Sequence, residues 1–169
     1  MAETSSLREY QRELSERLRA ADSGRAVSKL GVRIGGENWL VDLTDAAEVI
    51  PVPPITRVPL THHWFKGVTN IRGNLYSVVD FPAFVGGAGA ALNEQARLLI
   101  VNERFRMGSA LLVDASLGLR NPKQLRPVDS NDDTRAWVRA QYVDVEGRPW
   151  KELDLAKLMQ DPVFLGVGT

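Results

Sequence analysis

The sequence has 169 residues, no cysteine, and 21 basic residues against 21 acidic ones. This length fits one domain or two small fused domains. The lack of cysteine excludes disulfides and thiolate chemistry, and the charge balance argues against nucleic acid, whose binders usually carry a basic excess. The first residues have no signal-peptide pattern and no stretch approaches about 18 apolar residues, so we expect a cytoplasmic chain without direct membrane insertion.

The first predicted element is an N-terminal helix. Ser5 or Ser6 can cap it, and Gly24 can end it. Its apolar residues fall close to one face: Leu7, Tyr10, Leu14, Leu18 and Ala21. We expect residues 1–24 to form a helical extension, which either packs on the domain as a terminal helix or binds a partner separately.

From residue 27 the pattern changes to short strands with glycine between them. Leu30–Ile34 and Trp39–Leu43 alternate on either side of Gly35-Gly36-Glu37-Asn38, which predicts a hairpin. The following segment, 49–55, contains three prolines, so it is predicted to be an edge strand or a loop.

A second hairpin is predicted from residues 68–72 and 75–80, with Gly73-Asn74 as its turn pair. The glycine- and alanine-rich residues 86–91 read as a flexible connector. We therefore expect one domain over residues 25–165 that divides into two halves at a joint near 86–95.

The second half begins at Arg97 and contains residues 107–113, a nearly continuous apolar run typical of a central buried strand. Residues 136–145 and 150–153 predict a third hairpin, and Asp154 can cap a short helix over 155–160. No alternation of strands and helices indicates a parallel sheet. The predicted fold class is mainly β, built from small barrels.

No residue pattern indicates a catalytic, cofactor or metal site. His62 and His63 are adjacent and would point in different directions, so they are interpreted as ordinary loop or surface residues. The acidic stretch 129–133 begins like a calcium loop, but Thr134 and Ala140 stand where that loop needs Gly and Glu. The glycines at 86–89 lack the residues of a phosphate loop or a dinucleotide fingerprint.

The stretch from Phe65 to Asp80 resembles the central signature of chemotaxis coupling proteins, the CheW-like family. It has a glycine, the turn Asn70-Ile71-Arg72-Gly73, and then a valine-rich strand that ends in aspartate. The segments 47–50, 98–101 and 108–114 agree in order and spacing. The resemblance covers about residues 27 to 160.

This resemblance implies a fold of two five-stranded SH3-like β-barrel subdomains and a non-catalytic adaptor. Members bridge the regulatory domain of a CheA-like histidine kinase and the cytoplasmic tip of methyl-accepting chemoreceptors. One barrel would meet the kinase, and the groove between the barrels would accept the receptor. The residues carried over as partner-binding are Glu48, Asn70, Arg72, Gly73, Val78 and Asp80.

Among these residues, Glu48 and Arg72 are the two that could form an ion pair. An exposed pair contributes only about 0–1 kcal/mol, which favours a role in shaping a partner surface. The alternative is that Arg72 only braces the turn.

The sequence departs from the family pattern at Ser77 and at Phe81-Pro82. Together with the helical extension, this resembles the PilI-like adaptors of type IV pilus chemosensory systems, which serve twitching motility. Alternatives are a flagellar coupling protein, a regulatory fragment of a larger kinase, and a small β-barrel ligand-binding protein or enzyme. Since the chain has no phosphotransfer or ATP-binding segment, we expect a free-standing adaptor without a cofactor.

Overall fold

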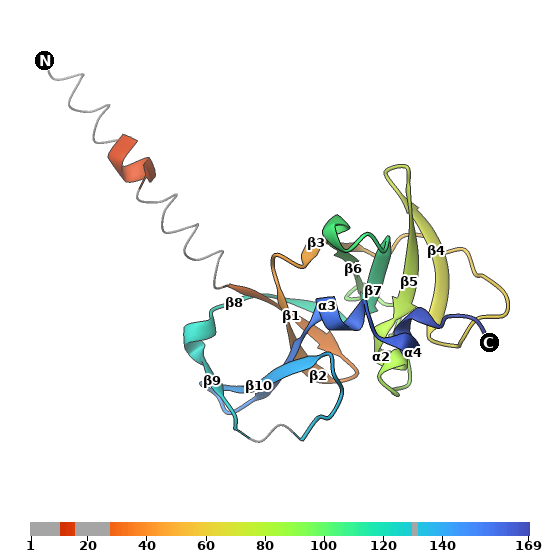
Figure 1. Cartoon of the computed structure of the whole chain (residues 1–169). Helices are drawn as coiled ribbons and strands as arrows, with labels where there is room; N and C mark the ends of the chain where they lie inside the picture. The colour runs from red at the N-terminus through yellow and green to blue at the C-terminus, as the bar shows by residue number, and fades with distance from the viewer. Residues whose placement is uncertain (1–10, 16–27, 130–131) are drawn as a thin grey trace, which may run out of the picture.

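Two β-sheets dominate the computed structural model, which describes residues 11–15, 28–129 and 132–169 (Figure 1). The six-stranded sheet has the order β8-β1-β2-β11-β10-β9. Its strands are β1 (Lys29–Ile34), β2 (Glu37–Asp42), β8 (Ala115–Arg120), β9 (Leu125–Pro127), β10 (Val138–Asp144) and β11 (Pro149–Leu153). The five-stranded sheet has the order β3-β6-β7-β5-β4. Its strands are β3 (Ala46–Pro51), β4 (Phe65–Ile71), β5 (Asn74–Asp80), β6 (Arg97–Val101) and β7 (Ser109–Val113).

Helices in the described part of the chain are short. They are α2 (Phe81–Phe84), α3 (Leu155–Leu158), α4 (Pro162–Leu165), and the 3-10 turns η1 (Glu103–Phe105) and η2 (Pro122–Gln124). Residues 11–15 are helical and exposed, and the rest of the predicted N-terminal helix lies outside the described residues. None of the helices described is long and apolar enough to cross a membrane.

The mainly β prediction is confirmed, and so are the local elements behind it. All five residues of β7 are buried at the centre of their sheet, and β3 is an edge strand that ends at Pro51. The third hairpin forms from β10 and β11, and Asp154 caps α3 by accepting the Lys157 N–H at 3.1 Å. The strand number differs from the expected five and five because β9 lengthens one sheet to six strands.

The turn of the second hairpin lies one residue earlier than predicted. Ile71 pairs with Asn74, so the two turn residues are Arg72 and Gly73, with φ of +51° and +87°. Two positive φ values suit the right-handed twist of a tight hairpin. Asn74, expected in the turn, is instead the first residue of β5.

The predicted joint near 86–95 is wrong as a boundary between the sheets. This segment connects α2 to β6, and both β5 before it and β6 after it belong to the five-stranded sheet. The chain instead leaves the six-stranded sheet after β2 and returns at β8. The glycine- and alanine-rich composition of this segment could not show where the chain passes between the sheets, because strand pairing, and not order along the chain, decides which strands share a sheet.

Each sheet contains one pair of neighbouring strands that run parallel. β2 pairs with β11 in the six-stranded sheet, and β5 pairs with β7 in the five-stranded sheet, while the other pairs are antiparallel. The β2–β11 pair joins Asn38 to Trp150 across more than half of the chain.

One core joins the two sheets, and it is rich in aromatic side chains. Six of its aromatic residues are joined by ring-to-ring contacts, and we call them the aromatic cluster: Trp39, Trp64, Phe81, Phe84, Trp137 and Phe164. Trp39 stacks on Trp137 at 5.8 Å between ring centroids, and Phe81 meets both rings edge-on. A second, aliphatic core lies on the other face of the five-stranded sheet, around Val78, Leu98 and Leu112.

A buried carboxylate lies in the six-stranded sheet. The Glu152 side chain is 3% exposed, and its oxygens accept from Lys29 Nζ at 2.5 Å and from the Tyr142 hydroxyl at 3.2 Å. Burial, followed by the charge of Glu152, raises the pKa of Tyr142. A buried charge needs such partners because water no longer solvates it.

Candidate protein-interaction surface

The structure brings Arg72 and Glu48 into an ion pair. Arg72 lies in the β4–β5 turn and Glu48 in β3, so the pair links opposite edges of the five-stranded sheet. The backbone of Thr56 also exchanges two hydrogen bonds with that of Val68 in β4, at 2.8 and 2.9 Å. These contacts show that the sheet curls until its two edges approach each other.

Both charged side chains remain open to solvent, with 69% of Arg72 and 40% of Glu48 exposed. Solvent screening limits such a pair to about 0–1 kcal/mol of stability. The pair therefore matters more for the shape and charge pattern of the surface than for folding.

The turn itself is held by Asn70. Its Oδ1 accepts the backbone N–H of Gly73 at 2.9 Å. Asparagine commonly forms such local bonds to its own backbone in turns. Asn70 thus holds the backbone of the turn that carries Arg72, and the Arg72 guanidinium pairs with Glu48.

A shallow hollow lies beside this ion pair, with a volume of about 330 Å³. Its lining combines charged, amide and apolar groups: Ala47, Glu48, Ile71, Arg72, Asn74, Tyr76, Ile100, Asn102 and Glu103. A second hollow of about 250 Å³ shares Asn74, Tyr76 and Glu103 and continues to Arg106 and Gly108. We call the combined area, from Glu48 and Arg72 to Arg106, the hairpin surface.

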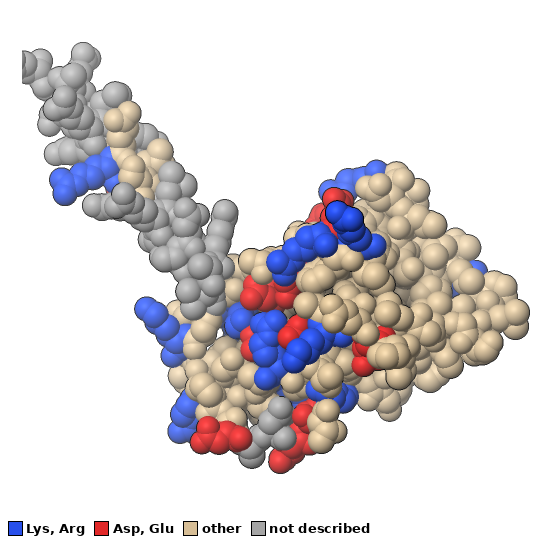
Figure 2. Space-filling view, viewed as in Figure 1, with Lys and Arg blue, Asp and Glu red and all other residues tan. Residues whose placement is uncertain are grey.

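The rim of the hairpin surface is charged, but it also includes one exposed apolar side chain, that of Leu75. Leu75 is 65% exposed next to the turn. Figure 2 shows charged atoms gathered at the end of the β4–β5 hairpin, whereas the side of the molecule over the body of β4 and β5 is largely uncharged. An apolar contact inside a polar rim is the usual composition of a protein-binding patch.

Two of the six sequence-predicted residues are not at this surface. Val78 and Asp80 are both 0% exposed, so neither can touch a partner directly. Val78 packs in the aliphatic core because it faces the inside of the curled sheet. Asp80 accepts the backbone N–H groups of Ala83 at 3.1 Å and Ala90 at 3.0 Å, so it caps α2 and fastens the connector.

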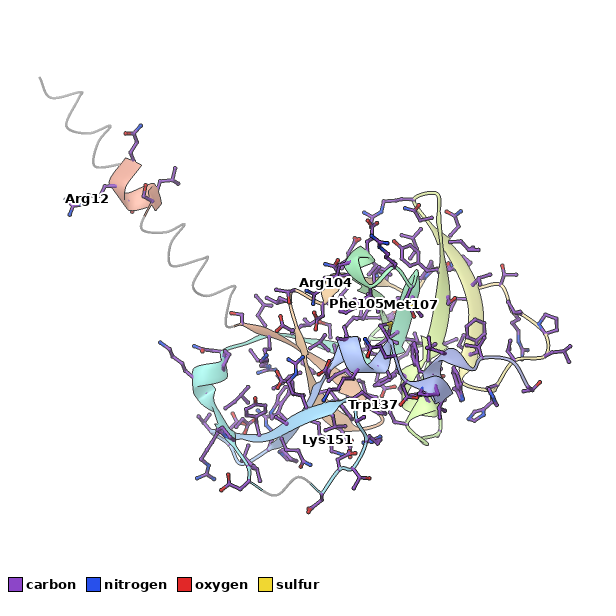
Figure 3. The ribbon with its side chains drawn as sticks, viewed as in Figure 1. Arg12, Arg104, Phe105, Met107, Trp137 and Lys151 are labelled. Carbon is purple, nitrogen blue, oxygen red and sulfur yellow. The ribbon has the colours of Figure 1, made fainter. Side chains whose placement is uncertain are left out.

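Sequence reasoning missed the η1 loop as part of the surface. Arg104 of η1 pairs with the buried Asp45, and Asn102 donates its backbone N–H to the Asp45 carbonyl at 2.8 Å. Figure 3 shows Arg104, Phe105 and Met107 on this loop beside β5. The sequence showed only a polar segment between the apolar strands β6 and β7, and such a segment does not indicate which residues lie next to it in the fold.

The histidines and the acidic stretch have ordinary surroundings. The His62 ring stacks on Trp64 at 5.3 Å, and His63 is exposed. Hydrogen bonding from Arg135 holds the pKa of Asp133 well below its usual range. Ser130 and Asn131 lie outside the described residues, and among the residues that are described no three or more His, Cys, Asp or Glu side chains are placed to hold a metal ion together.

Known proteins share this arrangement over most of the chain. The family profile described as CheW-like domain matches residues 29–163. Protein PilI of Pseudomonas aeruginosa is 31% identical over 109 residues, which cover 61% of each chain. The chemotaxis protein CheW of Helicobacter pylori is 28% identical over 93 residues, or 55% of this chain and 56% of that protein. The matches thus span less than two thirds of these two relatives.

Other relatives are matched over a larger share. The chemotaxis protein CheW of Thermotoga maritima is 27% identical over 143 residues, which cover 83% of this chain and 93% of that protein. The crystal structure of the scaffolding protein TtCheW from Thermoanaerobacter tengcongensis superimposes with a TM-score of 0.66 at 20% identity, covering 81% of this chain and 94% of that one. With the family profile matched over most of its length, this chain belongs to the CheW-like domain family.

Proposed function

We propose that this protein is a non-catalytic adaptor that couples the regulatory domain of a CheA-like histidine kinase to the cytoplasmic tip of methyl-accepting chemoreceptors. The observation that carries the proposal is the exposed Glu48–Arg72 pair at a hydrogen-bonded turn, next to the exposed Leu75. Membership in the CheW-like family and the likeness to a scaffolding protein support it.

The proposed pathway is type IV pilus chemosensing, with the protein acting in the cytoplasm at receptor arrays. Its support is the 31% identity to Protein PilI. A flagellar coupling protein is the second candidate, because several relatives are named chemotaxis protein CheW. Residues 25–165 would form the coupling unit, and residues 1–24 a separate helical extension.

The hairpin surface is the proposed kinase contact. Glu48, Asn70, Arg72 and Gly73 contribute to it, whereas Val78 and Asp80 are buried elsewhere, in the aliphatic core and at the start of α2. The Arg72 guanidinium and the exposed Leu75 would offer a partner one directional charged contact and one apolar contact.

The test measures binding of purified protein to pilus-type and flagellar-type CheA regulatory domains and receptor fragments by calorimetry. We expect binding to the pilus-type partners, and about tenfold weaker kinase binding for Arg72→Glu, equal to about 1.4 kcal/mol. The matched control is Arg57→Glu, since Arg57 is also exposed but lies away from the hairpin surface. Stronger binding to flagellar partners would transfer the assignment to that pathway, and binding to neither set would refute the coupling function.

A double exchange separates docking from bracing of the turn. Glu48→Arg combined with Arg72→Glu keeps an ion pair at the same place but reverses its direction. If a partner reads the position of the guanidinium, kinase binding stays weak in the double variant. Restored binding would mean that the pair only stabilises the turn.

A further inference from the structure

Two carboxylates at the beginning of β3 each hold an arginine from a different loop. Glu48 pairs with Arg72 of the β4–β5 turn, and Asp45, directly before β3, pairs with Arg104 of η1 (Figure 3). Both loops border the hairpin surface, because Arg72 lines one of its hollows and Glu103 of η1 lines both. One short segment of the chain is therefore bonded to both sides of that surface.

The two ion pairs differ in the burial of their carboxylates. Only 5% of the Asp45 side chain is exposed, against 40% of the Glu48 side chain. A buried carboxylate needs a partner because water no longer solvates it. In the part of the chain that the structure describes, Arg104 is the one cation paired with Asp45, and the Thr44 hydroxyl lies 3.5 Å from the same carboxylate oxygen. The fold therefore requires Arg104 at this place more strongly than it requires Arg72 beside Glu48.

Hydrogen bonds attach the beginning of the η1 loop to the same segment. Asn102 donates its backbone N–H to the Asp45 carbonyl at 2.8 Å and its side-chain amide to the Thr44 carbonyl at 3.2 Å. Asn102 also caps η1, because its Oδ1 accepts the backbone N–H of Arg104 at 3.0 Å. The loop thus has two attachments to the segment before β3, one at Asn102 and one through the Asp45–Arg104 pair.

The residues on either side of Arg104 form part of the hairpin surface. Glu103 lines both hollows, and Arg106 lines the second. Arg106 has a φ of +54°, a left-handed conformation that an arginine keeps only where its surroundings compensate the cost. Asp45 and Arg104 are not among the residues that line either hollow. Their pair can therefore influence the hairpin surface only through its neighbours in the η1 loop.

We infer that Asp45 is a positioning residue for the kinase contact: through Arg104 it holds η1 where Glu103 and Arg106 complete the hairpin surface. The inference rests on the proposed function of that surface. Asp45 is 4% exposed, so a bound kinase would depend on a carboxylate that it does not touch. Asp45 also lies between β2 and β3, where the chain passes from the six-stranded to the five-stranded sheet. The same joint thus places the η1 side of the hairpin surface relative to both sheets.

Calorimetry with a CheA regulatory domain tests this role on the full chain. Asp45→Asn removes the charge at nearly constant size, and we expect kinase affinity to fall about fivefold. Arg104→Gln should have a similar effect, and the double variant should bind no more weakly than the weaker single variant, because both changes remove the same contact. Arg104→Lys keeps a cation opposite Asp45 and should stay within about twofold of the native affinity. The matched control is Asp161→Asn, which removes a carboxylate charge at the start of α4 and should also stay within about twofold.

Amide hydrogen exchange without kinase gives a readout that a general loss of stability would not reproduce. In Asp45→Asn, the amides of residues 102–108, and that of Asn102 above all, should exchange faster than in the native chain, whereas Asp161→Asn should leave them unchanged. Because the Arg104 side chain is 53% exposed, its variants extend the test should Asp45→Asn fail to fold.

The outcomes separate this role from the function on which it rests. Unchanged exchange at 102–108, native kinase affinity in Asp45→Asn, or fully additive losses in the double variant would each overturn the positioning role while the native chain still binds the kinase. Weaker binding in Arg104→Gln alone would make Arg104 a direct contact and also overturn it. A native chain that binds no kinase would refute the coupling function, and the positioning role with it.

Discussion

At the scale of single residues, the hairpin surface depends on backbone conformations that few residues tolerate. Arg72 and Gly73 both have positive φ, and such conformations cost a non-glycine residue about 1 kcal/mol or more. The strain at Arg72 is offset locally by the Asn70 hydrogen bond to Gly73. A guanidinium is thereby presented at the tip of the turn, where asparagine or glycine would fold more easily.

Gly73→Ala tests this conformational requirement. No atom lies within 4 Å of the position that an alanine Cβ would take, so only the φ of +87° opposes the change. We expect the free energy of unfolding to fall by about 1 kcal/mol in urea denaturation. Gly168→Ala is the control, because its backbone is outside the positive-φ region and the new Cβ makes only ordinary contact. Equal losses in the two variants would contradict the argument.

Asp80→Ala tests whether that carboxylate supports the fold instead of contacting a partner. The change leaves the N–H groups of Ala83 and Ala90 without their acceptor and removes the cap of α2. We expect a loss of about 1–3 kcal/mol in chemical denaturation, with kinase affinity unchanged under conditions where the variant is folded. A variant as stable as the native chain but unable to bind would return Asp80 to the list of contact residues.

At the scale of elements, α2 and the aromatic cluster connect the two sheets. Phe81 is 0% exposed and contacts Trp39 of β2 and Trp137, which precedes β10 and is labelled in Figure 3. Phe84 extends the contacts to Trp64 and Phe164. Although α2 has only four residues, its two phenylalanine rings join the cores of the two sheets.

Phe81→Ala should reveal that importance. Removing a fully buried phenylalanine ring typically costs about 3–5 kcal/mol, because a cavity remains. We expect a loss of this size in urea denaturation, measured as a lower midpoint with a similar slope. Val145→Ala, at an 81% exposed position, should change the free energy of unfolding by less than about 0.5 kcal/mol. A small effect at Phe81 would show that the two sheets do not depend on this cluster.

The sequence predicted elements better than their assembly. Alternating apolar residues and glycine pairs located the hairpins, and the apolar run at 107–113 located the central strand β7, because these signals are local. The contact of Arg72 with Glu48 was anticipated only through the family resemblance. The burial of Val78 and Asp80 and the position of the η1 loop depend on which distant strands become neighbours, and no short sequence pattern encodes that.

At the scale of the whole molecule, acid should destabilise the fold through a few hydrogen-bonded carboxylates. The indole N–H of Trp150 and the backbone N–H of Arg148 lower the pKa of Asp144 to about 2, and Arg135 lowers the pKa of Asp133. Because these folded-state pKa values lie below the unfolded value of about 3.9, the stabilisation is complete above about pH 5 and is lost progressively as the pH falls toward 2.

Thermal unfolding between pH 7 and pH 2 measures this dependence. We expect a nearly constant midpoint from pH 7 to about pH 5, and a steep fall between about pH 4 and pH 2. Asp144→Asn should lower the midpoint temperature at pH 7 and make its fall below about pH 4 less steep. An equally steep fall in the variant would exclude Asp144 as a contributor.

The path of the chain between the sheets has a consequence for how the protein is made. Strands β3 to β7 are contiguous in the chain, but β2 must wait for β11, its parallel neighbour, before the six-stranded sheet can close. During synthesis, the five-stranded sheet with its hairpin surface can therefore form while β1 and β2 still have exposed edges. The hairpin surface, which is the proposed kinase contact, would therefore form before β9, β10 and β11 of the six-stranded sheet have left the ribosome.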